Sequence, residues 1–236
     1  MMKMTILAPR RAGMTHDEFR TYLTDVHGPL VRSITEVAAD IRHYHCNFPI
    51  AGATDTAFGH PIADLDVITQ GYFDSREAQL LNMQHPRFME FLRPDEANFA
   101  DTARAVMHYT DEHEIRPGPK TATKVFYLRR RADHLTRGEF QHRWMTEFAK
   151  LLDAVPGVSE IVARYVQNHA QAETFHPNGT ATKFYDVLDE VWLTHLDSLT
   201  MLGTVDAVAA TRELETELLD ASRTRAYIAT MVESIP

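Results

Sequence analysis

The chain of 236 residues is long enough for one large domain or two small ones, and its 44% hydrophobic and 24% charged residues are typical of a globular protein. A net charge of −9 argues against a nucleic-acid-binding surface, which needs concentrated positive charge. The single cysteine, Cys46, excludes an internal disulfide, and neither a signal region nor a membrane-spanning apolar run is visible, so we expect a cytoplasmic protein with no nucleic-acid or membrane partner.

The first half of the chain predicts six secondary-structure elements in the order β-α-β-β-α-β, which is the ferredoxin-like arrangement. Alternating apolar residues and boundaries rich in glycine and proline indicate strands over residues 3–9, 41–48, 65–73 and 103–113. Two helix starts show a capping pattern, Thr15 with Glu18 and Asp74 with Glu77, which satisfies free amides at the helix end. The first of these helices has apolar residues at helical spacing, so we expect it to bury one face.

A His27-Gly28-Pro29 sequence lies inside this first helical pattern. Proline disfavours a helical conformation in the residue before it, so we expect the helix to bend or restart at Gly28. This would place His27 beside irregular backbone, with its side chain at the edge of a packed face.

The same element order repeats after a linker, Arg116-Pro117-Gly118-Pro119, at the midpoint of the chain. Thr136 and Glu139 repeat the first capping box 121 positions later, and the expected strands cover residues 124–129, 161–169, 183–193 and 224–232. The second copy lacks the His-Gly-Pro sequence, and Phe148 stands at the position that corresponds to His27. The sequence therefore predicts an α+β chain of two tandem ferredoxin-like (βαββαβ) units, residues 1–116 and 117–236.

Five segments, three in the first half and two in the second, are similar to the pattern of a known family. The first half contains MTHDEFRTYLTDVHGPLV, RHYHCNF and the acidic segment RPDEANF (Arg93–Phe99), and the second contains ARYVQNH and DVLDEVWLTHLDSL. These segments resemble the EthD family of the dimeric α/β-barrel superfamily. The resemblance implies two four-stranded sheets that face each other around a central cavity, with helices outside. Two chains build this barrel in single-copy relatives, so we expect the two copies here to form an internal pseudo-dimer, in a monomer or a homodimer.

A strand face that lines a ligand cavity can be polar, whereas a face that packs on helices should be apolar. We apply this rule to the second and third strands of each half and assign one face of each strand to a single internal cavity. Tyr44 lies on such a face, and the side chains that we expect to bind substrate there are Gln70, Tyr72, Tyr165, Glu190 and Trp192.

His27 is the strongest candidate for a general acid or base, because imidazole titrates near neutral pH and can both take and return a proton. We expect Tyr44 to donate a hydrogen bond to a substrate oxygen or a developing enolate, and Asp66 to orient His27 or to act as the base itself. The alternative is structural: His27 caps a helix end beside Pro29, and Tyr44 only packs.

Glu190 allows two interpretations. A buried carboxyl group beside the aromatic ring of Trp192 would have a raised pKa and could serve as an acid. The competing interpretation is an ionised Glu190 that is paired with Lys124 or Arg164.

Metal binding is a further alternative, because His43 and His45 are two positions apart on a strand and point the same way. His27, His60 or Cys46 could add a ligand, and His27 or His169 could be an axial ligand of heme. No compact Cys/His or HExxH cluster is present, so we predict neither a metal site nor a cofactor.

The resemblance implies small-molecule chemistry, since EthD members occur in catabolic and polyketide-tailoring settings. We expect a cofactor-independent lyase or isomerase that dehydrates, cyclises or shifts a proton in a hydrophobic, aromatic or polyketide-like molecule. The alternatives are a non-catalytic ligand-binding or accessory protein of a catabolic oxygenase system, and a heme- or metal-dependent oxygenase.

Overall fold

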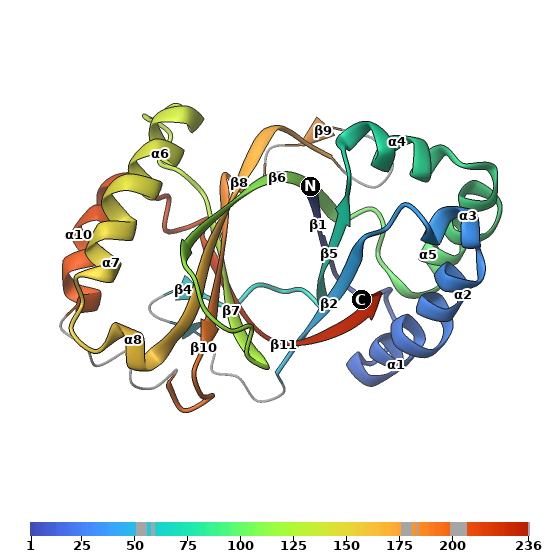
Figure 1. The fold of residues 1–236 in the computed structure, drawn as a ribbon, viewed down its shortest axis with the longest axis horizontal. Helices are drawn as coiled ribbons and strands as arrows, with labels where there is room; N and C mark the ends of the chain where they lie inside the picture. The colour runs from blue at the N-terminus through green and yellow to red at the C-terminus, as the bar shows by residue number, and fades with distance from the viewer. Residues whose placement is uncertain (51–55, 58–59, 176–180, 183, 199–206, 236) are drawn as a thin grey trace.

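Eight antiparallel strands form a closed barrel at the centre of the computed structural model, and helices cover it on two opposite sides (Figure 1). The structure describes residues 1–50, 56–57, 60–175, 181–182, 184–198 and 207–235. The barrel strands are β1 (Met2–Ala8), β2 (His43–Pro49), β5 (Val67–Phe73), β6 (Val106–Arg116), β7 (Thr123–Arg129), β8 (Val162–Phe175), β10 (Val187–Leu193) and β11 (Arg225–Ile235). Short strands β3 (Thr56–Ala57) and β4 (His60–Pro61) pair with each other, and β9 (Ala181–Thr182) pairs antiparallel with the end of β8.

The strands follow one another around the barrel in the order β10-β7-β11-β2-β5-β1-β6-β8, and the pairing of β8 with β10 closes it. The first half of the chain contributes four neighbouring strands in the order β2-β5-β1-β6, and the second half contributes β8-β10-β7-β11. Numbered within its own half, each set reads second, third, first, fourth. The two sets join where β6 pairs with β8 and where β2 pairs with β11.

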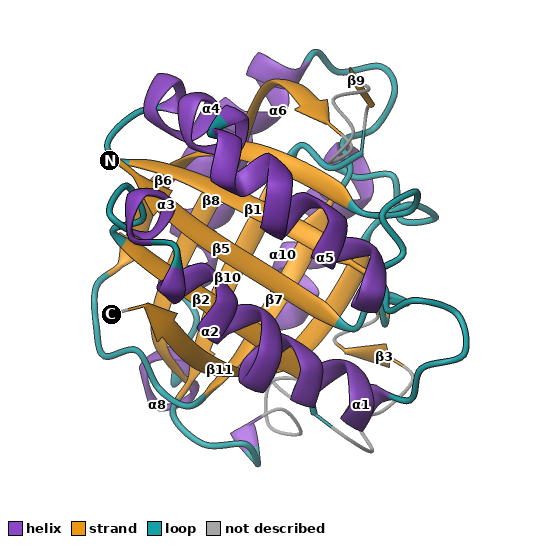
Figure 2. Ribbon diagram, turned by 90° about the vertical axis from the view of Figure 1, so that its right-hand side faces the viewer, coloured by secondary structure: helices purple, strands orange, loops and turns teal. Residues whose placement is uncertain are grey.

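Two groups of helices pack on the outside of the barrel (Figures 1 and 2). In the first half these are α1 (His16–Thr21), η1 (Tyr22–His27), α2 (Gly28–Ser33), α3 (Thr35–Ala38), α4 (Arg76–Gln84), η2 (Phe88–Leu92) and α5 (Arg93–Phe99). In the second half they are α6 (Arg137–Arg143), η3 (Trp144–Phe148), α7 (Ala149–Asp153), α8 (Val158–Ile161) and α10 (Ala207–Leu218). Among the residues that the structure describes, no helix is long and apolar enough to cross a membrane.

Local signals in the sequence set the helix starts. Thr15 and Thr136 both form the predicted capping boxes with Glu18 and Glu139. The predicted cap at Asp74 is wrong, because Ser75 caps α4 by accepting a hydrogen bond from the amide of Ala78.

The backbone at His27 differs from the expected break. Residues Tyr22–His27 form a π-helical segment, and the amide of Gly28 donates to the carbonyl of Leu23, five residues earlier. Gly28 is itself helical, with φ −59° and ψ −49°, and α2 continues from it with Pro29 in its first turn. A proline is tolerated there because a first-turn amide has no partner within the helix. Since Trp144–Phe148 is also π-helical without a proline, the proline is not the cause of the segment.

The inside and the outside of the barrel are two separate environments, because successive side chains of a strand point to opposite faces. On the outside, Tyr44 and Cys46 of β2 pack with Phe19 and Leu23 under the first-half helices. On the inside, an apolar cluster combines residues of both halves: Leu7, Ala63, Ile68, Phe126, Leu128, Tyr185, Leu188, Tyr227 and Ala229. The barrel interior is therefore a packed core.

A buried polar network continues this interior core. The carboxylate of Glu190 accepts hydrogen bonds from Lys124 Nζ (2.6 Å) and Gln70 Nε2 (2.7 Å), and it also pairs with Lys3. Asn168 Nδ2 donates to the same carboxylate at 2.9 Å. Because these side chains belong to β1, β5, β7, β8 and β10, the network joins the two halves of the barrel.

Candidate functional site

His27 and Asp95 form a buried pair between the first-half helices and the sheet. His27 ends η1, Asp95 lies in the first turn of α5, and Nδ1 of His27 is 2.8 Å from Oδ2 of Asp95. The other carboxylate oxygen of Asp95 accepts hydrogen bonds from the Tyr22 hydroxyl (2.6 Å) and from Asn98 Nδ2 (3.2 Å). The two side chains are therefore held in place from several directions, with 8% of His27 and 9% of Asp95 exposed.

The environment sets the protonation state of this pair. Burial lowers the pKa of His27 below 6.5, although the hydrogen bond and negative charge of Asp95 act in the opposite direction. Burial alone would raise the pKa of Asp95, but hydrogen bonds from Tyr22, His27 and Asn98 outweigh it and lower that pKa. At neutral pH the pair is consequently a neutral imidazole beside an ionised carboxylate.

This charge state decides which nitrogen of His27 carries the proton. An ionised carboxylate can only accept, so Nδ1 of His27 must donate its hydrogen to Asp95, which leaves a lone pair on Nε2. Among the described residues, Nε2 has no hydrogen-bonding partner. A neutral histidine held in this way by a carboxylate has the arrangement of a general base.

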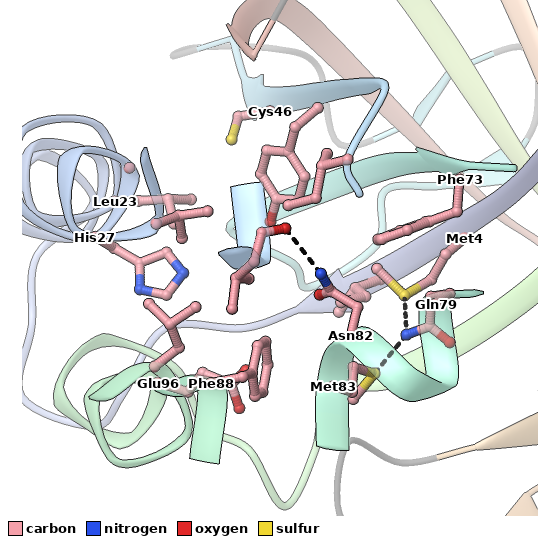
Figure 3. Close-up of a pocket in the computed structure, with 17 residues that line it drawn as sticks. Met4, Leu23, His27, Cys46, Phe73, Gln79, Asn82, Met83, Phe88 and Glu96 are labelled. Carbon is pink, nitrogen blue, oxygen red and sulfur yellow. Dashed lines mark hydrogen bonds between the residues drawn. The ribbon is translucent and has the colours of Figure 1, made fainter. Parts of the chain in front are cut away.

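The His27 side chain lines a pocket between the helices and the outer face of the sheet, which we call the His27 pocket (Figure 3). The pocket has an empty volume of about 740 Å³, which includes its open mouth. Its walls are mostly aliphatic, aromatic or thioether side chains: Met4, Ile6, Leu23, Val31, Val37, Ile41, Phe73, Met83, Phe88 and Leu92. The polar side chains that line it are His27, Tyr44, Gln79, Asn82 and Glu96. An apolar cavity with a few polar groups is typical of small-molecule sites.

Tyr44 and Glu96 contribute the other titratable groups of the pocket. Burial is the main cause that raises the pKa of Tyr44, so its hydroxyl keeps its proton and can donate a hydrogen bond. Burial also raises the pKa of Glu96, although the guanidinium of Arg93, 2.7 Å away, opposes the shift. The pocket thus combines a neutral base with a hydroxyl donor and a carboxyl group.

The sequence comparisons match the half of the chain that contains this pocket. The EthD domain family matches residues 11–103, which include His27, Tyr44 and Asp95. Conidial pigment biosynthesis dehydratase EthD of Metarhizium robertsii is 34% identical over 113 residues, which are 45% of this chain and 79% of that protein. Dehydratase aurZ of Gibberella zeae is 30% identical over 110 residues, 44% of this chain and 72% of that protein. The chain belongs to the EthD family.

The fold is that of the dimeric α/β-barrel superfamily, in agreement with the resemblance. An anthrone oxidase-like protein of known structure superimposes with a TM-score of 0.62, over 99% of this chain and 92% of the other. The sequence identity is 8%, so this likeness concerns the fold alone.

Asp66 does not line the pocket that contains His27, and the expectation that it orients His27 is wrong. Its carboxylate accepts from the amide of Arg10 (2.7 Å) and pairs with the side chains of Arg10 (2.5 Å) and His16 (2.6 Å). Asp186, its counterpart in the second half, likewise accepts from the amide of Arg131 (3.0 Å) and pairs with its guanidinium (2.5 Å). The same contacts in a half that lacks the histidine indicate a structural role for Asp66.

Four of the five expected substrate-binding residues also lie outside the pocket that contains His27. Gln70 and Glu190 belong to the polar network inside the barrel, with Lys3 beside Tyr72 and Lys124 beside Trp192. Tyr44 and Tyr72 are thus on opposite faces of the sheet, which corrects the prediction of one shared internal cavity. Glu190 is ion-paired with Lys124, as in the second interpretation: burial raises its pKa, but Lys124 and Lys3 together lower it well below 4.5.

Tyr165, the fifth expected residue, lines a second pocket on the outer face of the other half. There Phe148 stands where the first half has His27, and the buried guanidinium of Arg129 lies over the Tyr127 and Trp144 rings, with ring centroids at 4.4 and 4.8 Å. Arg129 pairs with Asp189 (3.0 Å), which also accepts from the Tyr165 hydroxyl (2.9 Å). The Arg129–Asp189 ion pair forms part of the pocket wall. His60 also lines this pocket, but its Nε2 contacts Arg129 at 2.9 Å, and the position of His27 itself is taken by Phe148.

Sequence reasoning missed Asp95, the partner of His27, and Gln79 and Asn82, which also line the pocket. The segment Arg93–Phe99 was recognisable as part of the EthD pattern, but nothing local indicated which of its acidic residues meets a histidine 68 positions away.

The two histidines of β2 do not form part of a metal-binding group in the described residues. His43 and His45 do lie on one face, with ring centroids 6.3 Å apart. In the described part of the chain, no three His, Cys, Asp or Glu side chains are grouped so that they could hold a metal ion.

Proposed function

We propose that this EthD-family chain is a dehydratase for a hydrophobic, aromatic or polyketide-like small molecule, with His27 as its general base. The observation that carries the proposal is the lone pair on His27 Nε2 at the wall of an apolar pocket, with Asp95 fixed behind the ring. The two relatives named as dehydratases support the reaction class.

The chemistry of a dehydration fits these groups step by step. Nε2 of His27 takes a proton from the carbon next to a carbonyl group, which leaves an enolate and an imidazolium that Asp95 stabilises. The imidazolium then returns this proton to the hydroxyl group on the neighbouring carbon as the C–O bond breaks. The products are a carbon–carbon double bond and water, and His27 is neutral again.

Tyr44 has the role of stabilising the enolate in this proposal. Its hydroxyl keeps its proton because burial raises its pKa, and it lines the same pocket as His27. A hydrogen bond to the developing negative charge is stronger in a site from which water is excluded. No redox cofactor enters the proposal, because loss of water leaves the overall oxidation state of the substrate unchanged.

We also propose that the barrel is a pseudo-dimer of two tandem ferredoxin-like units, residues 1–116 and 117–236. The identical strand order in the two halves and the duplicated Arg10–Asp66 and Arg131–Asp186 pairs support this. In this arrangement only the first unit has the His27 base, so one chain has one reaction site.

Loss of water from a defined substrate tests the function. A panel of bicyclic and tricyclic aromatic β-hydroxyketones is incubated with the protein, and mass spectrometry records products that are lighter by one water. We expect turnover of at least one member by the wild-type protein and none above background by His27→Ala. Binding without loss of water would instead support the non-catalytic ligand-binding alternative.

A further inference from the structure

Gln79 is fully buried, with 0% of its surface exposed, yet it lines the His27 pocket. It lies on α4, which packs against the outer face of β1 and β6 through Met4 and Tyr109. A buried amide normally has strong hydrogen-bonding partners for both its oxygen and its nitrogen, since an unsatisfied group costs free energy.

The oxygen and the nitrogen of the Gln79 amide have partners of different strength. Its oxygen accepts a hydrogen bond of 2.6 Å from the hydroxyl of Tyr109. Its nitrogen is directed at two thioether sulfurs, Met4 Sδ at 3.3 Å and Met83 Sδ (Figure 3). A thioether is only a weak acceptor, so the NH2 group has no strong partner among the described residues.

The neighbouring contacts fix this orientation. The guanidinium of Arg76 lies over the Tyr109 ring, 4.6 Å from its centroid, and hydrogen-bonds the hydroxyl. Because Arg76 can only donate, the Tyr109 proton is left for Gln79 Oε1. The opposite orientation of the amide would place its oxygen against two sulfur lone pairs. The NH2 group of Gln79 is thus held toward the pocket.

Gln79 and His27 lie at opposite sides of the pocket, with apolar walls between them (Figure 3). Asn82, on the same helix, has used both hydrogens of its amide, because Nδ2 donates to the carbonyl of Val37 (2.8 Å) and to the carboxylate of Asp40 (3.3 Å). Of the two amide side chains with which α4 lines the pocket, Gln79 is therefore the one whose NH2 group lacks a strong acceptor.

We propose that the NH2 group of Gln79 binds an oxygen atom at the end of the substrate remote from the reacting carbon. The substrate class is then an elongated aromatic ketone with a second oxygen, hydroxyl or carbonyl, on the ring distant from the ketone. Resting on the proposed function, this inference makes Gln79 a specificity-determining residue of the dehydratase. A ligand oxygen would replace two weak sulfur contacts with one full hydrogen bond between mostly apolar walls, which favours substrates that have this oxygen.

Binding of two matched probes tests the inference without any turnover. Isothermal titration calorimetry compares 6-hydroxy-1-tetralone with 1-tetralone, which differ only in the distal hydroxyl. We expect the wild-type protein to bind the hydroxylated probe about 3- to 10-fold more tightly, the range of one net hydrogen bond. In Gln79→Met, which keeps the length of the side chain but removes the donor, the ratio of the two dissociation constants should fall to about one.

Three further variants make the result specific. Leu81→Met, an exchange on the exposed side of the same helix, should leave the ratio at the wild-type value. Tyr109→Phe retains Gln79 but frees its amide to rotate, so it should give an intermediate ratio even if Gln79→Met does not fold. His27→Ala should keep the wild-type ratio, which separates recognition of the oxygen from the proposed chemistry.

Three outcomes would overturn the proposal. The first is a wild-type ratio near one, and the second is a folded Gln79→Met that retains the wild-type ratio. The third is the absence of binding of either probe to the wild-type protein, which would reject the substrate class itself. Failure of the dehydration assay with an intact binding ratio would reject the proposed function alone.

Discussion

His27 Nδ1 and Asp95 Oδ2 are 2.8 Å apart across two helical segments that are separated by 68 positions in the sequence. At the corresponding positions of the second half, Phe148 replaces the histidine and Leu214 replaces the aspartate, because matching backbone contacts align Ala100 with Leu219. Within the described residues, the second half thus has neither member of the pair. The first three predictions below concern this pair, and the last two concern ion pairs elsewhere in the barrel.

Replacing His27 by alanine should lower kcat/KM for dehydration by about 100- to 10,000-fold, the usual contribution of a positioned general base. His142→Ala, which removes an exposed histidine of α6, is the matched control and should retain wild-type activity. Steady-state kinetics measure kcat/KM for both variants, and circular dichroism verifies that each is folded. Full activity in a folded His27→Ala protein would remove His27 from the mechanism.

The pH dependence of kcat/KM should report the protonation of His27. Since burial lowers the pKa of His27, kcat/KM should rise with pH to a plateau, with a midpoint below 6.5. The base is inactive when protonated, so activity is lost on the acidic side. A rise centred well above 6.5 would contradict this assignment.

Asp95→Asn should move the same midpoint to a still lower pH. The Asp95 carboxylate is the group that raises the pKa of His27 against the effect of burial, so its removal leaves burial unopposed. The plateau rate should also fall, because an asparagine can hold the imidazole in the wrong tautomer. An unchanged pH profile would show that the Asp95 charge does not act on His27.

Asp66→Asn should reduce stability and leave the pH profile of the reaction unchanged. The loss of two charged contacts to Arg10 and His16 should cost about 1–3 kcal/mol. Asp186→Asn is its counterpart in the other half and should show a similar loss in urea unfolding. A selective loss of kcat with normal stability in Asp66→Asn would restore a role in the reaction.

Glu190→Gln should destabilise the barrel by about 3–5 kcal/mol, because Lys3 and Lys124 would lose a shared buried anion. The pKa of Glu190 is lower in the folded than in the unfolded protein, so its contribution to stability is present above pH 4.5 and is lost as the pH falls below that value. The variant should therefore lose less stability than the wild type on acidification. Equal acid-induced losses in urea titrations at several pH values would contradict the assignment.

Much of the fold could be predicted because its signals are local. The capping boxes at Thr15 and Thr136 need only the residues of the first helical turn, and both are present in the structure. The centres of all eight barrel strands were predicted from alternation and boundaries, with shifts of a few residues at their ends. His27 and Tyr44, which were predicted to act together, line one pocket, but that pocket lies on the outer face of the sheet and not inside the barrel as expected.

The sequence by itself therefore determined the secondary-structure elements, their order in each half and the position of His27 in the first helical segment. Only the tertiary structure decided which face of the sheet is accessible to a ligand, and it separated Tyr44 from Tyr72 and Glu190. Alternation along a strand indicates that its two faces differ in polarity. Whether space for a ligand remains beside a face depends on what packs against that face. Here the two halves fill the barrel interior with an apolar core and an ion network, whereas the first-half helices leave space beside the outer face. Asp95 meets His27, and Gln79 reaches the same pocket, because packing brings distant segments together at that outer face.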